Sequence, residues 1–267
     1  MNPRLEFVPK SRYDVKDLID IVKLLRSPNG CPWDIKQTHK SIRSNFLEET
    51  YEAIEAIDND DVDLLREELG DVLLQVVFHS QMEDEVGNFD FDDVANDICQ
   101  KLVARHPHVF SNVVANNEQE ALASWNKAKM ELKSQKNQSD AMISISKVLP
   151  SLMKSDKILS KASQAGFDWD NVEGALSKLR EELLELEEAI RSGDKSHCNE
   201  ELGDVLFSTV NVSRFLEIDP EYSLSEACNK FIKRFCNVEK LVKSKGINLK
   251  DLTQNELVTI WKQAKKM

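Results

Sequence analysis

The chain has 267 residues, of which 41% are apolar and 31% are charged, a balance typical of a globular protein and unlike that of a disordered or membrane-embedded chain. Glycine (8) and proline (7) are both scarce, which disfavours a many-stranded sandwich or barrel and predicts a mostly helical protein. The net charge of −12 argues against stable nucleic-acid binding, which needs a basic face. An anionic substrate remains compatible if a divalent cation offsets its charge.

Cysteine usage and hydropathy bear on where the protein works. The five cysteines are scattered, odd in number and without C-x-x-C spacing, so neither a disulfide framework nor a zinc site is indicated. The N-terminus has no apolar segment like that of a signal peptide, and no run approaches the ~18 apolar residues of a membrane span. We therefore expect a cytoplasmic protein with no membrane partner.

The sequence contains an internal repeat. The run EELGDVL begins at Glu67 and again at Glu200, an offset of 133 residues. A Glu-Glu-x-x-Glu motif that begins at Glu48 recurs at the same offset. Trp-Asp, Lys-x3-Arg and Trp-x2-Ala-Lys pairs recur at slightly different offsets. The chain is therefore predicted to hold two tandem helical domains, residues 1–133 and 134–267.

Apolar residues recur with a period close to 3.6 in the centre of each copy, which predicts paired helices. No convincing period-two alternation is present, so the fold class is predicted to be all-α, with about five helices in each copy. The predicted central helices span residues 42–57 and about 61–82 in the first copy, and residues 176–190 and about 195–216 in the second. Each pair is separated by a short polar turn, which makes its helices antiparallel neighbours.

Capping patterns predict where a later helix of each copy begins. Ser223 and Glu226 have the spacing of a capping box, and Asp90 and Asp93 stand in the matching place of the first copy. Both pairs are therefore predicted to open a helix.

Pairs of carboxylates are predicted to converge between the two central helices of each copy. Residues three apart share one face of a helix, and each helix carries two acids at that spacing. Four oxygen ligands without His or Cys suit a hard cation, which we expect to be Mg²⁺, with Mn²⁺ as a possible substitute. The predicted metal ligands are Glu49, Glu52, Glu68 and Asp71 in the first copy, and Glu182, Glu185, Glu201 and Asp204 in the second.

The same acids also admit simpler interpretations. A run of charge is usually a solvated helix face, and the protein could be a purely structural helical protein. It could also be a sensor or scaffold that binds Mg²⁺-nucleotide without cleaving it. Gly70 and Gly203 favour a functional site, because a mid-helix glycine costs ~1 kcal/mol relative to alanine and so indicates close packing or the approach of a ligand.

Basic and aromatic pairs at helical spacing are candidates for nucleotide contacts. Lys-x3-Arg places two cations on one helix face, where they could meet phosphate oxygens. Trp-x3-Lys could stack a base while the amine holds a phosphate, although salt bridges and a core tryptophan are the alternatives. The five histidines show no ligand pattern and are taken as incidental. The candidate contacts are Lys101, Arg105, Trp125 and Lys129 in the first copy, and Lys230, Arg234, Trp261 and Lys265 in the second.

The duplicated carboxylate motifs, with GCPWD at residues 30–34 and RHPHVF at residues 105–110, resemble the two-domain MazG family of the all-α nucleoside triphosphate pyrophosphatases. The resemblance covers nearly the whole chain. It implies an enzyme that hydrolyses nucleoside triphosphates, with a broad base range and both sugars, to the monophosphate and pyrophosphate using Mg²⁺. It also implies a homodimer of helical bundles.

The resemblance further implies roles for individual residues. The eight carboxylates become metal ligands, and the basic and aromatic residues become nucleotide contacts. Glu48 and Glu181 are candidates to orient or deprotonate the attacking water. The second copy is expected to be the main catalyst, because its longer, lysine-rich connection at residues 241–256 could close over a nucleotide. The catalytic residues expected on this basis are Glu181, Glu182, Glu185, Glu201 and Asp204.

Overall fold

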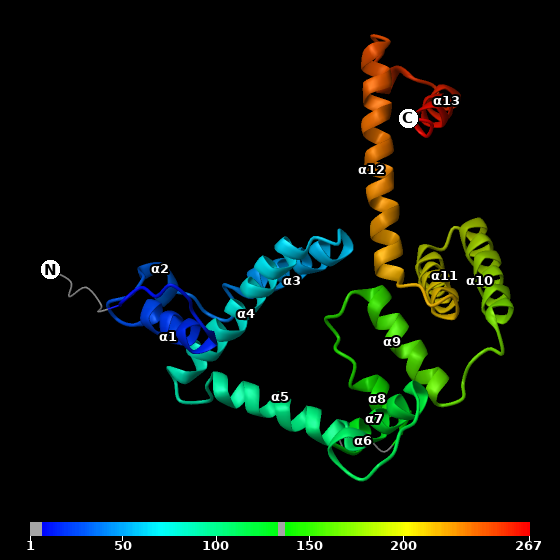
Figure 1. Cartoon of the computed structure of the whole chain (residues 1–267). Helices are drawn as coiled ribbons and strands as arrows, with labels where there is room; N and C mark the ends of the chain where they lie inside the picture. The colour runs from blue at the N-terminus through cyan, green and yellow to red at the C-terminus, as the bar shows by residue number, and fades with distance from the viewer. Residues whose placement is uncertain (1–6, 133–136) are drawn as a thin grey trace. The chain divides into compact units, whose positions relative to one another are not determined.

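The computed structural model describes residues 7–132 and 137–267. These residues form thirteen α-helices and one short 3-10 helix, and they contain no strand (Figure 1), which confirms the predicted all-α class. The chain divides into two compact units, Met1–Lys129 and Met130–Met267. The domain boundary predicted between residues 133 and 134 lies outside the described residues.

The first unit is built around the hairpin of α3 and α4 (Figure 1). Asn59 and Asp60 form its turn, with Asp60 in the left-handed region, at φ 54°. The Asp61 carboxylate then caps α4 by accepting a hydrogen bond from the Leu64 N–H. The helices of this unit are α1 (Val15–Arg26), α2 (Pro32–Ile35), α3 (Arg43–Asp58), α4 (Val62–Asp84), α5 (Phe91–Arg105), α6 (Pro107–Phe110) and α7 (Glu118–Leu132), the last of which extends past the division between the units.

The core of the first unit lies at one end of α4, where α1 packs against it. Val22 and Val77 are almost completely buried there, beside Phe78 and Met82. Towards the start of α4 and along α3 the apolar residues are less buried, and Tyr51 is 51% exposed. The central hairpin therefore leaves part of its apolar surface uncovered within the chain.

The second unit repeats the central hairpin as α10 and α11. Gly193 ends α10 in the left-handed region, at φ 74°, a conformation that costs glycine little. Asp194 then caps α11 by accepting hydrogen bonds from two backbone N–H groups. The helices of this unit are α8 (Gln138–Ile143), α9 (Ser151–Gln164), α10 (Val172–Ser192), α11 (Lys195–Phe215), α12 (Pro220–Ser244), the 3-10 helix η1 (Leu249–Asp251) and α13 (Gln254–Ala264).

The helices α12 and α13 pack on each other around a small apolar cluster. Val238 and Val242 from α12 meet Ile260 and Ala264 from α13, all buried. Trp261 packs against this cluster from its edge. The cluster fixes α13, and with it Trp261, near the C-terminal end of α12 (Figure 1).

Two boundaries predicted in the second copy are wrong. Ser223 does not open a helix, because Asp219 caps α12 four residues earlier and a proline occupies the first turn. The connection predicted at residues 241–256 is also shorter, since α12 continues to Ser244 and α13 begins at Gln254. In the first copy the capping box of Asp90 and Asp93 is confirmed at the start of α5.

Candidate functional site

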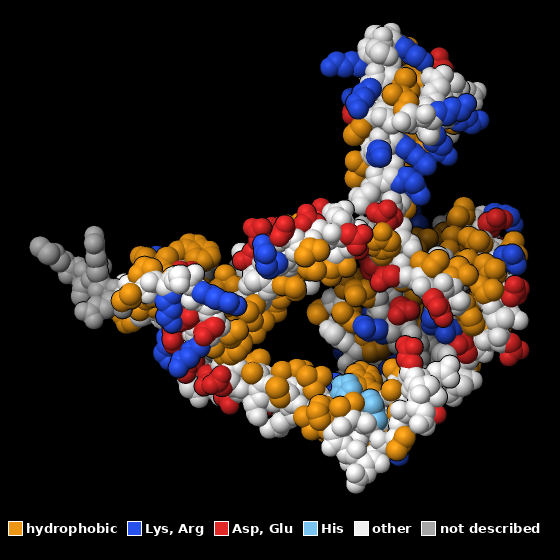
Figure 2. Space-filling model, viewed as in Figure 1, with side chains coloured by type: hydrophobic (Ala, Val, Ile, Leu, Met, Phe, Trp, Pro, Cys, Tyr) orange, Lys and Arg blue, Asp and Glu red, His pale blue; other side chains and the backbone are white. Residues whose placement is uncertain are grey.

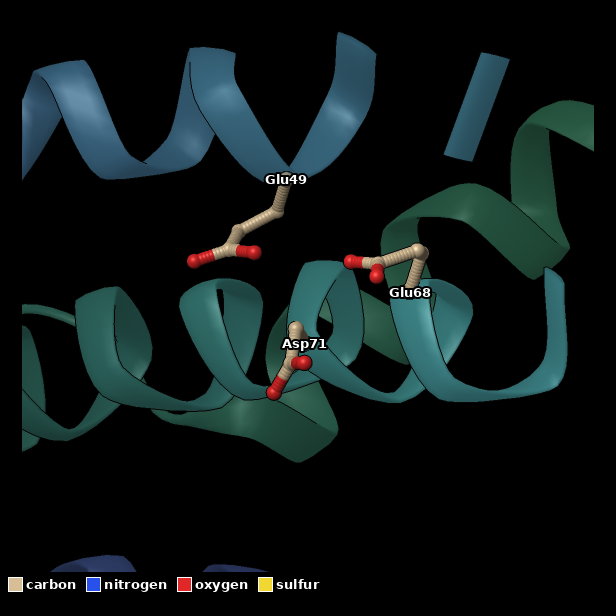
Figure 3. Close-up of side chains that lie close together, drawn as sticks. All are labelled: Glu49, Glu68 and Asp71. Atoms are coloured by element: carbon tan, nitrogen blue, oxygen red, sulfur yellow. The ribbon is translucent and has the colours of Figure 1, made fainter. Parts of the chain in front are cut away.

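In the first unit, three of the predicted carboxylates converge between the hairpin helices. Glu49 projects from α3 toward Glu68 and Asp71 on α4 (Figure 3). One oxygen from each side chain lies within 4.8 Å of the others. Glu68 is buried, while Glu49 and Asp71 are half-buried. The i, i+3 spacing on α4 and the antiparallel pairing with α3 produce this convergence.

Among the described residues, no lysine or arginine forms an ion pair with this cluster, so its carboxylates mainly repel one another. Burial raises the pKa of Glu49, and the charges of Asp71, Glu52 and Glu68 raise it further. Burial also raises the pKa of Glu68, followed by the charges of Glu52 and Asp71. Glu52 therefore belongs to the same electrostatic group, although its oxygens are not among the three that converge. A cation bound to such a group is stabilised because it relieves the repulsion between the carboxylates.

In the second unit, Glu182 on α10 converges with Glu201 and Asp204 on α11, again with oxygens within 4.8 Å. Glu182 and Glu201 are buried, and Asp204 is exposed. A side-chain hydrogen bond with Glu182 raises the pKa of Glu185, with burial and the charges of Glu182 and Glu201 adding to it. The two copies thus bring equivalent acids together.

Glu201 carries the observation that best fits a cation. Its Oε1 atom lies 3.1 Å from Nε2 of His197, one turn earlier on α11. Its Oε2 atom is buried and has no hydrogen-bond partner among the described residues. A buried oxygen left unpaired costs free energy, and a hard divalent cation is the ligand that three carboxylates would accept there. The residues present therefore fit the expected metal.

Two residues beside this cluster were not predicted. Lys178 Nζ lies 2.9 Å from Glu182 and 2.7 Å from Glu181, and these carboxylates raise the pKa of Lys178. His197, taken as incidental, contacts Glu201. Lys178 stands three and four residues before the acids that it contacts, and His197 stands four residues before Glu201. Such spacings can be read in the sequence but are common on charged helices. Glu181 itself is mostly exposed and is held by Lys178.

In the first unit, the predicted basic and aromatic residues gather around Trp125 on α7. The Arg105 guanidinium lies 5.6 Å from the centre of the Trp125 ring, and Lys129 Nζ lies 4.6 Å from it. Arg105 Nε is buried without a hydrogen-bond partner in the described residues. Lys101 is exposed, one turn before Arg105 on α5. Three of the four predicted contacts are therefore brought together.

In the second unit, the corresponding residues occupy α12 and the end of α13. The Trp261 ring packs against Phe231, with 5.1 Å between ring centres. Lys230 is exposed and Arg234 is half-buried on α12, and Lys265 is exposed just after α13. Lysine and arginine side chains gather over these two helices in Figure 2. No ion pair in residues 7–132 and 137–267 joins Lys230 or Arg234 to the carboxylates.

The two mid-helix glycines are not explained by packing inside the chain. A Cβ atom built at Gly70 or at Gly203 would have no atom of the described residues within 4 Å beyond its own helix. Of the two predicted reasons for these glycines, close packing against the described residues is therefore not observed. The approach of a ligand remains as the predicted reason for them.

Comparison with known proteins identifies the family. The model of the MazG nucleotide pyrophosphohydrolase domain matches the chain twice, at residues 37–110 and 171–239. The chain belongs to the MazG family. It is 44% identical over 250 residues to the nucleoside triphosphate pyrophosphohydrolase/pyrophosphatase MazG of Thermotoga maritima, covering 94% of this chain and 95% of the relative.

Other relatives extend this similarity. The nucleoside triphosphate pyrophosphohydrolase of Escherichia coli is 42% identical over 252 residues, 93% of this chain and 96% of the relative. The YabN protein of Bacillus subtilis is 43% identical over 248 residues, 92% of this chain but 50% of the relative. Both carboxylate clusters lie inside the matched MazG ranges. Within the described residues, no helix combines the length and apolarity that crossing a membrane requires.

Proposed function

We propose that this MazG-family chain hydrolyses nucleoside triphosphates, ribo- and deoxyribo- with a broad base range, to the monophosphate and pyrophosphate. The supporting observation is the duplicated cluster of converging carboxylates, in which a buried oxygen of Glu201 has no partner among the described residues. The names of the Thermotoga maritima and Escherichia coli relatives support the reaction. Mg²⁺ is the proposed cofactor, with Mn²⁺ as a substitute.

The proposed ligands of the cation in the second unit are Glu182, Glu185, Glu201 and Asp204. A divalent cation there would supply charge stabilisation at the phosphates and a lowered pKa for bound water. Glu181 is proposed to orient or deprotonate the attacking water, and Lys178 holds its carboxylate next to Glu182. The proposed first-unit ligands are Glu49, Glu52, Glu68 and Asp71, with Glu48 in the place of Glu181.

The basic and aromatic residues are proposed to bind the triphosphate. Arginine and lysine can each donate hydrogen bonds to phosphate oxygens. An exposed or half-buried side chain gives up few existing contacts when it binds a phosphate. The concentration of positive side chains on α12 and α13 supports a role in holding an anionic substrate (Figure 2). The proposed contacts are Lys230, Arg234, Trp261 and Lys265 in the second unit, and Lys101, Arg105, Trp125 and Lys129 in the first.

The protein is further proposed to act as a homodimer in the cytoplasm. Large apolar side chains remain exposed on the central hairpins and on α12, where Phe231 is 56% exposed and Ile232 is 60% exposed. A second copy of the chain would cover such faces, and the burial of their apolar surface would stabilise the dimer. The odd number and scattered spacing of the cysteines are compatible with a reducing compartment.

The deciding experiment measures pyrophosphate and monophosphate release from ATP with Mg²⁺, with Mn²⁺ and with a chelator. The proposal requires release that depends on the divalent cation and falls at least ~100-fold in Asp204→Asn, which removes one ligand charge at constant size. Glu200→Gln, an exposed neutral substitution on the same helix, serves as the control. Nucleotide binding without release would identify a sensor or scaffold, and neither binding nor release would identify a structural protein.

A further inference from the structure

Two histidines and a glutamate form a cluster in the first unit that the proposed reaction does not use. His39 lies in the turn before α3, and His79 and Glu83 stand one turn apart on α4. His79 follows Asp71 by eight residues, which is about 12 Å of helix rise. The cluster is therefore separate from the carboxylates that are proposed to hold Mg²⁺.

The two histidines face each other through ring nitrogens. Nδ1 of His39 lies 2.7 Å from Nδ1 of His79, and the two ring planes are inclined by only 10°. This distance is shorter than the ~3.5 Å that separates carbon atoms in van der Waals contact, so the rings meet at their Nδ1 edges and not at their faces. Because the lone pair of a ring nitrogen lies in the ring plane, both Nδ1 atoms point into one small volume between the rings.

Glu83 determines which nitrogen of His39 carries a proton. Its Oε1 atom lies 2.6 Å from Nε2 of His39, and its Oε2 atom accepts a hydrogen bond of 2.6 Å from the Asn88 side chain. The hydrogen bond from Asn88 lowers the pKa of Glu83, and the one with His39 lowers it further, so the carboxylate is ionised. An ionised carboxylate accepts the Nε2–H of His39, which leaves a lone pair on Nδ1 of the neutral ring.

His79 is also in the form that binds metals. Burial lowers the pKa of His79, and the neighbouring His39 lowers it further, so its ring is neutral near neutral pH. Without a cation, one proton on Nδ1 of His79 is the donor to Nδ1 of His39. When that proton resides on Nε2 of His79 instead, both Nδ1 atoms offer lone pairs to the same volume. A carboxylate behind a ligating imidazole, as Glu83 is behind His39, is the usual second partner of a zinc-bound histidine.

We propose that His39 and His79 bind a divalent transition-metal cation such as Zn²⁺ through their Nδ1 atoms, with Glu83 orienting His39. Imidazole nitrogen suits such cations, whereas Mg²⁺ prefers oxygen, so this site and the carboxylate clusters select different metals. Tetrahedral zinc places two imidazole nitrogens about 3.3 Å apart, so the 2.7 Å pair opens by about 0.6 Å on binding. The His39 side chain is 46% exposed, which leaves it room to move and lets water complete the coordination.

The cation would join the turn before α3 to α4. Phe46 in the first turn of α3 packs on the His79 ring, with 5.7 Å between ring centres, and Glu49 follows Phe46 by three residues on α3. A cation between His39 and His79 therefore stabilises the start of α3 against α4.

This site is particular to the first unit. At the offset of 133 residues, Val212 and Leu216 stand in the places of His79 and Glu83, so the duplication that carries the carboxylates does not carry this cluster.

The test measures Zn²⁺ binding by titration calorimetry with Mg²⁺ in large excess, so that Mg²⁺ occupies the carboxylate clusters. We expect wild-type protein to bind Zn²⁺, and His39→Phe and His79→Phe to lose this binding, because each variant keeps a ring and removes a ligand nitrogen. Glu83→Gln should weaken Zn²⁺ binding roughly 10-fold or more, as for loss of a carboxylate behind a metal ligand. His106→Phe, which removes a histidine outside the cluster, should bind Zn²⁺ as wild type does.

A second measurement reports the ligand atoms. With Cu²⁺ as the probe, the electron paramagnetic resonance spectrum should show coupling to two ring nitrogens in wild type and in His106→Phe, and lose it in His39→Phe. Zn²⁺ should also raise the melting temperature of wild type and leave that of His39→Phe unchanged.

The outcomes do not depend on whether the protein hydrolyses nucleotides. Unchanged Zn²⁺ binding in folded His39→Phe would overturn the proposal. Loss of Zn²⁺ binding in Glu68→Gln with Asp71→Asn would overturn it as well, because the cation would then lie at the carboxylates. His79 is half-buried, so if His79→Phe fails to fold, the exposed His39 and its variant decide the question.

Discussion

Replacing Glu201 by glutamine should stabilise the metal-free protein while abolishing its response to Mg²⁺. Glu201 is buried, and its carboxylate shares the cluster with Glu182 and Asp204, with oxygens within 4.8 Å. At that distance two unit charges repel by about 3.5 kcal/mol at an effective dielectric constant of ~20, and by about 0.9 kcal/mol in water. The substitution removes this repulsion from two neighbours and keeps the shape of the side chain.

The loss of the His197 contact offsets part of the gain. A surface ion pair is worth about 0–1 kcal/mol, and His197 is half-exposed. Two neighbours at about 0.9–3.5 kcal/mol each, less about 0–1 kcal/mol for the His197 contact, give a net stabilisation without metal of about 1–7 kcal/mol. Asp204 is exposed, which favours the lower part of this range, and each kcal/mol raises the melting temperature of a domain of this size by roughly 4 °C. Wild-type protein should overtake the variant as Mg²⁺ is added, since a ligand at 100 times its Kd contributes about 2.7 kcal/mol.

The assay is thermal unfolding in a chelator and in a series of Mg²⁺ concentrations, with Glu200→Gln as the control for charge on an exposed neighbour. The variant should have the higher melting temperature in the chelator, and the wild type should have the higher melting temperature at saturating Mg²⁺. If Glu201→Gln is less stable than wild type in the chelator, the repulsion argument is wrong. If the variant gains as much from Mg²⁺ as wild type does, Glu201 does not hold the cation.

Three other outcomes are expected. Glu201→Gln with Asp204→Asn should abolish pyrophosphate release, and Glu68→Gln with Asp71→Asn should reduce it far less; the reverse result would make the first copy the main catalyst. Lys178→Met should lower the Mg²⁺ concentration that gives half-maximal activity, because it removes the lysine ammonium that competes with Mg²⁺ for Glu182. An unchanged or higher Mg²⁺ concentration would contradict this. The stability gain of Glu68→Gln over wild type in a chelator should grow as pH rises, because a raised folded-state pKa costs stability above the ordinary glutamate range; paired melts at acid and neutral pH test the sign.

The carboxylate clusters could be predicted because their geometry is local. Residues three apart on one helix, and two helices joined by a short turn, leave few arrangements for Glu68 and Asp71 other than facing Glu49. The offset of 133 residues then carries the same geometry to the second copy. The start of α12 was missed because Asp219, Pro220 and Ser223 offer competing helix starts, and the combination of an aspartate cap with proline in the first turn was the stronger.

A cavity of about 470 Å³ lined by α8, α9, α11 and the segment before α10 could not be predicted, because it depends on tertiary packing. Its lining runs from Met142 to Asn211, and no periodicity connects these positions. The Trp169-Asp170 pair is repeated in the sequence, but no pattern there indicates that Trp169 and Phe207 line the same cavity. Such a site requires the relative placement of α8, α9 and α11, which depends on contacts far apart in the chain.

An electrostatic difference distinguishes the two carboxylate clusters. The first cluster has raised pKa values at Glu49 and Glu68 and no ion pair to a described lysine or arginine, so its full ionisation is costly. In the second cluster Lys178 lies 2.9 Å from Glu182, and His197 contacts Glu201. The equivalent first-copy positions are Asn45 and Leu64. Identical ligand motifs therefore lie in different electric fields, because the Lys178 ammonium offsets part of the carboxylate charge in the second cluster and no described lysine or arginine pairs with the first.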